Sequence, residues 1–142
     1  AVYADLKYVD REDPERVIRY WRSGGFTRRQ LAWGWMPPHP TLFVNRAHFL
    51  EVGLFDTQFR IAGDYDHMLR LLTHDDTEVA YLPEVVTLMR VGGVSNRSLK
   101  NLHQKSSEDY RIIRKNLGRG GLTLLAKNVR KVPQFLSPKI TS

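Results

Sequence analysis

Residues 53–72, GLFDTQFRIAGDYDHMLRLL, are the stretch that decides the fold. Gly53 and the pair Phe55-Asp56 are typical of a turn, and a helix is predicted to open at Asp64. Its apolar positions recur at helical spacing on one face: Met68, Leu71 and Leu72. A carboxylate at the positive end of a helix, directly after Gly63, suits a catalytic base and equally suits a plain N-cap.

Asp66 raises the question of a metal site, because Asp64-Tyr65-Asp66 matches the pattern D-x-D. Such a pair binds an ion when both carboxylates project to one side, as they do on an extended strand. On a helix, residues two apart diverge, so this pair is not predicted to bind metal. We expect Asp66 instead to stabilise the helix dipole or to bond Arg70 one turn later.

Upstream of this stretch, partial alternation predicts a strand over residues 2–9. Asp13-Pro14 then combines an N-cap with a proline at the first helical position, and predicts a helix that ends at residues 23–25. The following segments are predicted to be irregular over 26–35, extended over 37–40, a strand over 41–44 and a short helix from about 46 to 52.

Downstream, His74-Asp75-Asp76 is predicted to form a loop. The elements expected after it are strands over 79–82 and 85–91, a long amphipathic helix capped by Ser98 and ended by Gly118, and a basic helix over 122–132 stopped by Pro133. Strands that alternate with helices predict an α/β or α+β fold.

The chain has 142 residues, enough for one domain, and its 42% hydrophobic content indicates a real core. Cysteine is absent, which excludes disulfides and thiolate metal sites. No apolar run approaches the ~20 residues that span a bilayer, and no signal pattern opens the chain. We therefore expect a cytoplasmic protein, either soluble or peripheral at the inner face of the membrane.

Charge is distributed unevenly along the chain. Residues 1–96 hold 11 Lys/Arg and 13 Asp/Glu, whereas residues 97–142 hold 11 Lys/Arg and only two acids, Glu108 and Asp109. Such a basic segment is either a solvated helix face or a surface for anionic lipid or nucleic acid. In the lipid interpretation, Lys127, Arg130 and Lys131 face phospholipid. Nucleic acid is the weaker partner, because aromatic residues do not interleave with these cations.

The loop over residues 34–41 combines several prolines with aromatic rings. Prolines stiffen a loop, and a stiff loop can present a ring to a sugar. Trp35 and His39 are either part of a carbohydrate cleft or ordinary core and polar residues. The other histidines have no convergent spacing, so no metal ligands are predicted among them.

Taken together, these motifs resemble the inverting, nucleotide-sugar-dependent glycosyltransferases of family 2. The resemblance covers about residues 3–93 and rests on P-P-H-P-T, on F-D-x-x-F-x-I-A-x-D-Y-D and on L-R-L, in that order. It implies a partial GT-A, Rossmann-like domain with a small mixed sheet and C-terminal helices. Residues 1–97 would be its acceptor-side half, and residues 98–142 a basic helical extension.

The resemblance also implies roles for particular residues. Asp64 would be the base that deprotonates the acceptor hydroxyl, although Gly63 stands where a glutamate is usual in the family. The acceptor contacts would be Trp35, His39, Thr41 and Asp66. No cofactor is expected in this chain, because the D-x-D that holds Mn²⁺ or Mg²⁺ in the family belongs to the nucleotide-binding half. We therefore expect the chain alone to be inactive and to bind no nucleotide sugar.

Two alternatives to an enzyme remain open from the sequence: a non-catalytic oligomeric scaffold and a basic module for anionic surfaces or nucleic acid. A sheet that lacks half of its strands would expose an edge and an apolar face. We therefore expect a homo-oligomer, with a two-fold dimer as the simplest form.

Overall fold

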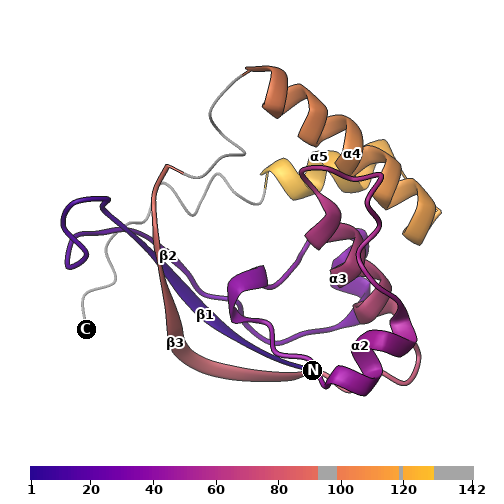
Figure 1. Cartoon of the computed structure of the whole chain (residues 1–142), viewed down its shortest axis with the longest axis horizontal. Coiled ribbons are helices and arrows are strands. Elements are labelled where there is room, and N and C mark those ends of the chain that lie inside the picture. The colour runs from indigo at the N-terminus through magenta and orange to yellow at the C-terminus, as the bar shows by residue number, and fades with distance from the viewer. Residues whose placement is uncertain (93–98, 119, 130–142) are drawn as a thin grey trace.

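The computed structural model describes residues 1–92, 99–118 and 120–129. A three-stranded mixed sheet lies at one side, and helices α2, α3, α4 and α5 gather on the other (Figure 1). The elements, in chain order, are β1 (Val2–Val9), β2 (Val17–Trp21), α1 (Arg28–Ala32), the 3-10 helix η1 (His39–Thr41), α2 (Arg46–Val52), α3 (Gly63–Thr73), β3 (Ala80–Arg90), α4 (Leu99–Leu117) and α5 (Gly121–Val129). The predicted α/β fold with a small mixed sheet and C-terminal helices is confirmed.

The predicted strand over residues 2–9 forms as the centre of the sheet, in the order β2-β1-β3. β1 runs antiparallel to β2 and parallel to β3. Because it has a neighbour on each side, β1 buries most of its side chains, Tyr3 and Leu6 completely. Its buried Asp5 accepts hydrogen bonds from the hydroxyls of Tyr20 and Tyr81 at 2.7 and 2.8 Å, and from the N–H of Ser23 at 2.8 Å.

The predicted helix after Asp13 is wrong, because this segment is a hairpin that leads into β2. The acidic side chains do cap backbone groups, but those of a turn. Asp10 accepts from the N–H of Glu12 at 2.9 Å, and Asp13 accepts from the N–H of Glu15 at 3.0 Å. Asx turns and helix N-caps use the same side chains, and pairing with β1 decided between them.

Three further predictions about local structure are corrected. Residues 41–44 do not form a strand, since η1 ends at Thr41 and only an isolated bridge joins Phe43 to Val2. Residues 26–35 are not wholly irregular, because a capping box at Thr27 starts the short helix α1. The two strands expected around Pro83-Glu84 are one edge strand, β3, whose pairing with β1 shifts register there. Proline is tolerated at a sheet edge.

α3 and α4 bring the core together. Leu69 and Leu72 of α3 are fully buried, as are Ile112 and Ile113 of α4, and all four belong to one apolar cluster with Tyr3 of β1. The C-terminal half of α4 therefore packs its apolar face within the molecule, through Ile112, Ile113 and Leu117. The predicted helix 46–52 is confirmed as α2. The predicted cap at Ser98 and the stop at Pro133 lie outside the described residues.

No helix in the described part of the chain has the length and apolar character needed to cross a membrane.

Candidate functional site

The start of α3 is held by a side chain from α4. The carboxylate of Glu108 accepts hydrogen bonds from the N–H groups of Ile61 and Ala62, both at 2.9 Å, and of Arg60 at 3.3 Å. The side chain of Gln104 donates a further bond at 2.9 Å. Burial by itself would raise the pKa of Glu108, but these hydrogen bonds outweigh it and hold the pKa below its usual value. Residues 60–62, which lead into the candidate base Asp64, are thus held in place by α4.

Asp64 is the second residue of α3, and its side chain is exposed. The N-cap is Ala62, so the predicted N-cap position of Asp64 is wrong. Its carboxylate accepts the N–H of the next residue, Tyr65, at 2.7 Å. Glu108, and not Asp64, accepts the backbone N–H groups at the start of α3. Capping therefore does not explain why an acid stands at position 64. What remains is an accessible carboxylate in the first turn, where the helix dipole favours a negative charge.

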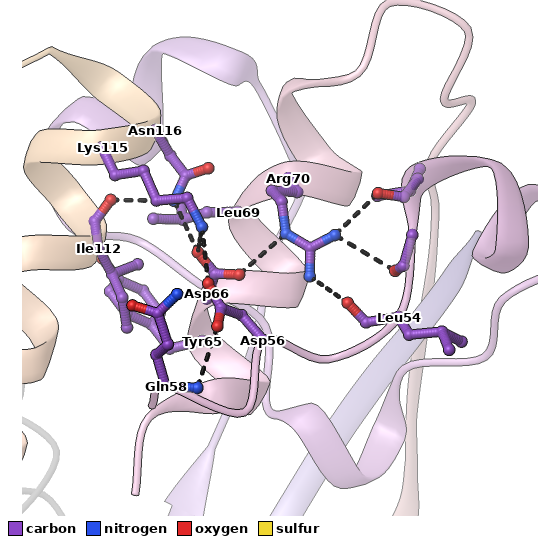
Figure 2. A network of polar contacts seen from close by, with 12 residues as sticks. Leu54, Asp56, Gln58, Tyr65, Asp66, Leu69, Arg70, Ile112, Lys115 and Asn116 are labelled. Atoms are coloured by element: carbon purple, nitrogen blue, oxygen red, sulfur yellow. Dashed lines mark hydrogen bonds and ion pairs between the residues drawn. The ribbon is translucent and has the colours of Figure 1, made fainter. Parts of the chain in front are cut away.

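Asp66 has the opposite environment, because its side chain is fully buried in a polar network (Figure 2). Arg70 donates from Nε at 2.9 Å, which confirms the predicted contact one turn later. From α4, Asn116 donates at 3.0 Å and Lys115 lies 3.4 Å away. Asp66 therefore joins α3 to α4, and in this structure it does not face solvent.

Arg70 extends the same network to the loop between α2 and α3. Its terminal nitrogens donate to the carbonyl groups of Val52 at 2.8 Å, Gly53 at 3.2 Å and Leu54 at 2.7 Å (Figure 2). Lys115 also bonds Asp56 at 3.0 Å. The turn predicted around Gly53 and Asp56 is thus attached to α3 and α4 by charged hydrogen bonds, which are stronger than neutral ones.

Trp35 and Thr41, predicted as acceptor contacts, lie in the interior. Trp35 meets the ring of Tyr3 edge-on at 5.5 Å between centroids, and its Nε1 donates to the carbonyl of Ser23 at 3.1 Å. Thr41 is fully buried, with its hydroxyl 2.9 Å from the carbonyl oxygen of Ala4. The bond of Thr41 thus attaches η1 to β1, whereas Trp35 packs against β1 and the segment after β2. Acceptor contact by either residue stays a prediction.

His39 lies at the start of η1 and is exposed. Its ring centroid is 6.5 Å from that of Phe55, and Phe55 in turn lies 5.0 Å from the buried ring of His67 on α3. Burial first, and then the charge of Arg70, lower the pKa of His67, so the ring is neutral at physiological pH. His67 follows Asp64 by three positions, hence on the same side of the helix. A row of ring contacts therefore links the exposed His39 through Phe55 to His67, which lies one turn after Asp64 on α3.

A group that could hold a divalent cation lies at the other end of α3. One ligand atom each from Glu51, His74 and Asp76 falls within 4.8 Å of the others. A hollow of about 530 Å³ opens nearby, lined by Ala1, Asn45, His48, Asp75, Asp76 and Glu78. Ten residues of helix separate Asp64 from His74, which is about 15 Å. This group is therefore remote from the candidate base.

Comparison with known proteins finds no relative for the chain. A scan against protein-family models gives no match, and neither a search of curated proteins nor a search of solved structures finds one. The resemblance to family 2 glycosyltransferases thus rests on the sequence motifs, and the interpretation of the site rests on its geometry.

Sequence reasoning missed Glu108, Phe55 and His67. The bonds of Glu108 to residues 60–62 join segments more than 40 positions apart, and no local pattern announces such a contact. Phe55 and His67 had a weak signal, since both fall inside the stretch that decides the fold. Their convergence with His39 depends on how η1 packs against α3.

Proposed function

We propose that the chain is the acceptor-side half of a nucleotide-sugar-dependent, inverting glycosyltransferase, with Asp64 as the general base. The observation that carries the proposal is the contrast between two acids close in sequence, Asp64 and Asp66. Asp66 is buried and bonded to Arg70 and Asn116, whereas Asp64 is exposed on a helix start that another helix holds in place. Only Asp64 can meet a substrate without breaking the network.

The proposed reaction is a single displacement at the anomeric carbon. Asp64 takes the proton of the acceptor hydroxyl as the hydroxyl oxygen bonds to the sugar, and the nucleoside diphosphate leaves. The proposal assigns acceptor contact to His39 and Phe55, since an imidazole can bond a sugar hydroxyl and a ring can cover an apolar sugar face. Thr41 positions His39 indirectly, because its hydroxyl bonds η1 to the carbonyl of Ala4 on β1.

The divalent ion expected for such an enzyme would neutralise the leaving diphosphate. The residues described here do not fit that role, because Glu51, His74 and Asp76 lie at the far end of α3 from Asp64. The proposal therefore assigns the ion and the nucleotide to the donor-binding half and gives this chain no step through them.

The test is a transfer assay on the full-length gene product that carries these residues. Radiolabelled UDP-, GDP- and dTDP-sugars are offered with lipid and oligosaccharide extracts, and the wild type is compared with Asp64→Asn. Loss of a general base costs about 10²–10⁴-fold in rate. Donor affinity, measured by calorimetry, is expected to stay within about twofold, because the base acts on the transition state.

Two further variants sharpen the assay. Glu84→Gln, at an exposed position on β3, is the control and should keep full activity. Asp66→Asn should lower the melting temperature together with the activity, since it weakens a buried network. Full activity in a folded Asp64→Asn protein would refute the role of Asp64. A wild type that neither binds nor transfers any of these sugars would refute the proposed function.

A further inference from the structure

α5 has its polar and apolar faces reversed with respect to the protein. Its buried side chains are Thr123 and Lys127. Leu124 packs against the core, but three other large apolar side chains point outward: Leu122 is 82% exposed, Leu125 62% and Val129 57%. A helix that covers a protein core normally turns its apolar stripe inward and its charges toward water.

The inward face of α5 is attached at several points. Lys127 pairs with Asp109 of α4 at 2.8 Å, and its ammonium lies 3.2 Å from the ring centroid of Tyr65. The hydroxyl of Thr123 donates to the carbonyl of Ala32 at 2.9 Å. Gly34 approaches so closely that a Cβ there would lie 2.5 Å from the backbone of Lys127. These contacts fix the helix rotation, so α5 cannot turn its leucines inward.

The outward face carries no charge to keep it in water. Its exposed positions are Gly121, Leu122, Leu125, Asn128 and Val129. The three large apolar side chains stand at i, i+3 and i+7, which places them in one row along the helix. The only ionic side chain within α5, that of Lys127, is buried in the ion pair with Asp109. Such a face is suited to an apolar environment supplied from outside.

Charge selects the partner. Residues 110–142 contain eight Lys/Arg and no Asp/Glu. In a two-fold contact through α5, the neighbouring α4 helices, with Arg111 and Arg114 exposed on each, would approach one another, and like charges would oppose association. Nucleic acid would match the charge but offers no apolar surface to a leucine row. An anionic bilayer offers both: lipid phosphates for the cations and acyl chains for the leucines.

We propose that α5 is a membrane-surface anchor, which lies in the interface of an anionic bilayer with Leu122, Leu125 and Val129 inserted. Interfacial helices of this kind bury their apolar face about 5–10 Å deep and do not span the bilayer. This corrects the expectation that Lys127 faces phospholipid, because Lys127 is buried against Asp109 and Tyr65. The anchor is independent of the proposed glycosyl transfer.

The first experiment measures vesicle binding of the full 142-residue chain by co-sedimentation. Vesicles of phosphatidylcholine with 30 mol% phosphatidylglycerol are compared with pure phosphatidylcholine. We expect binding to the anionic vesicles that weakens as salt is raised. The double variant Leu122→Ser/Leu125→Ser should bind at least about tenfold more weakly than the wild type, with an unchanged melting temperature. The control is Leu88→Ser, an equally exposed leucine on β3, 59% exposed, which should bind as the wild type does.

The second experiment uses the absence of cysteine in the chain. Leu125→Cys and Leu88→Cys each create one site for a polarity-sensitive fluorophore. Anionic vesicles should shift the emission to the blue at position 125 and leave position 88 unchanged.

Several results would overturn the anchor. These are wild-type binding equal on both kinds of vesicle or absent from both, undiminished binding of the double serine variant, and a label at position 125 that stays in water. A lipid-free dimer that the serine pair dissociates would show that a second copy covers this face. Tighter binding to duplex DNA than to anionic vesicles would assign the charge to nucleic acid.

Discussion

α3 and α5 are short helices that each bury a charged side chain, Asp66 and Lys127, but that treat leucine in opposite ways. α3 buries Leu69, Leu71 and Leu72 completely. α5 buries Lys127 and leaves Leu122 and Leu125 in solvent. The difference lies in what each helix meets. α3 meets the apolar cluster between the sheet and α4, whereas α5 meets the carboxylate of Asp109, which makes a buried ammonium tolerable. The polarity of a residue thus predicts its side of a helix only when the neighbouring surface is known.

The largest loss of stability is expected when the buried Lys127–Asp109 pair, which holds α5 in its orientation, is removed. Asp109→Ala leaves the ammonium of Lys127 buried without its partner, and we expect a loss of about 3–5 kcal/mol in the free energy of unfolding. The double variant Asp109→Leu/Lys127→Met should recover most of it. Asp75→Ala, which breaks the exposed pair with Arg28, is the control and should cost less than about 1 kcal/mol. Urea unfolding followed by circular dichroism measures all three, and equal losses for Asp109→Ala and Asp75→Ala would contradict the prediction.

A pair of identical substitutions tests the leucines directly. Leu69→Ala on α3 should cost about 2–5 kcal/mol, because it opens a cavity in a core where Leu69 is fully buried. Leu125→Ala on α5 should change the free energy of unfolding by no more than about 0.5 kcal/mol, since its side chain is largely in solvent. The same urea titrations give both values. A cost at Leu125 close to that at Leu69 would mean that α5 packs its leucines against the protein after all.

A loss smaller than that at Leu69 is expected at the cap of α3. Glu108→Gln should lower the free energy of unfolding by about 1–2 kcal/mol at neutral pH, because a neutral amide accepts the three backbone bonds less well. The pKa of Glu108 is lowered in the folded state, so its contribution is complete above the unfolded pKa of about 4.3 and is lost as pH falls through the folded value.

The difference between the wild-type and Glu108→Gln stabilities should therefore shrink on acidification below about pH 4.3. Subtracting the two curves removes the other carboxylates with lowered pKa, such as Asp56, which titrate in both proteins. The pKa of Asp56 is lowered by a hydrogen bond from the N–H of Gln58 and by a bond from Lys115. A difference that grows as the pH falls would contradict the assignment of the cap.

Local patterns predicted the elements that depend on local interactions. β1, α2, α3 and α4 lie close to their expected positions, and the bond between Asp66 and Arg70 formed as the one-turn spacing predicts. β2 could not be predicted, since its acidic turn has the side chains of a helix start and only pairing with β1 excludes the helix. For the site, the family resemblance named Asp64 and His39, and their roles stay predictions. The cap by Glu108 and the burial of Asp66, which separate the two acids, arise from contacts between α3 and α4.

The position of β1 has a consequence for synthesis. β1 is the middle strand, yet its parallel partner β3 begins about 70 residues after β1 ends. Even the backbone nitrogen of Ala1 is bonded to the carbonyl of Glu78, at 2.7 Å. A ribosome that adds about 5–20 residues per second needs roughly 4–14 s to deliver β3. During that interval the β1–β2 hairpin is complete, but one edge of β1 has no strand to pair with. Nascent chains at this stage are the ones that we expect chaperones to bind, and pairing of β3 is the step that ends their exposure.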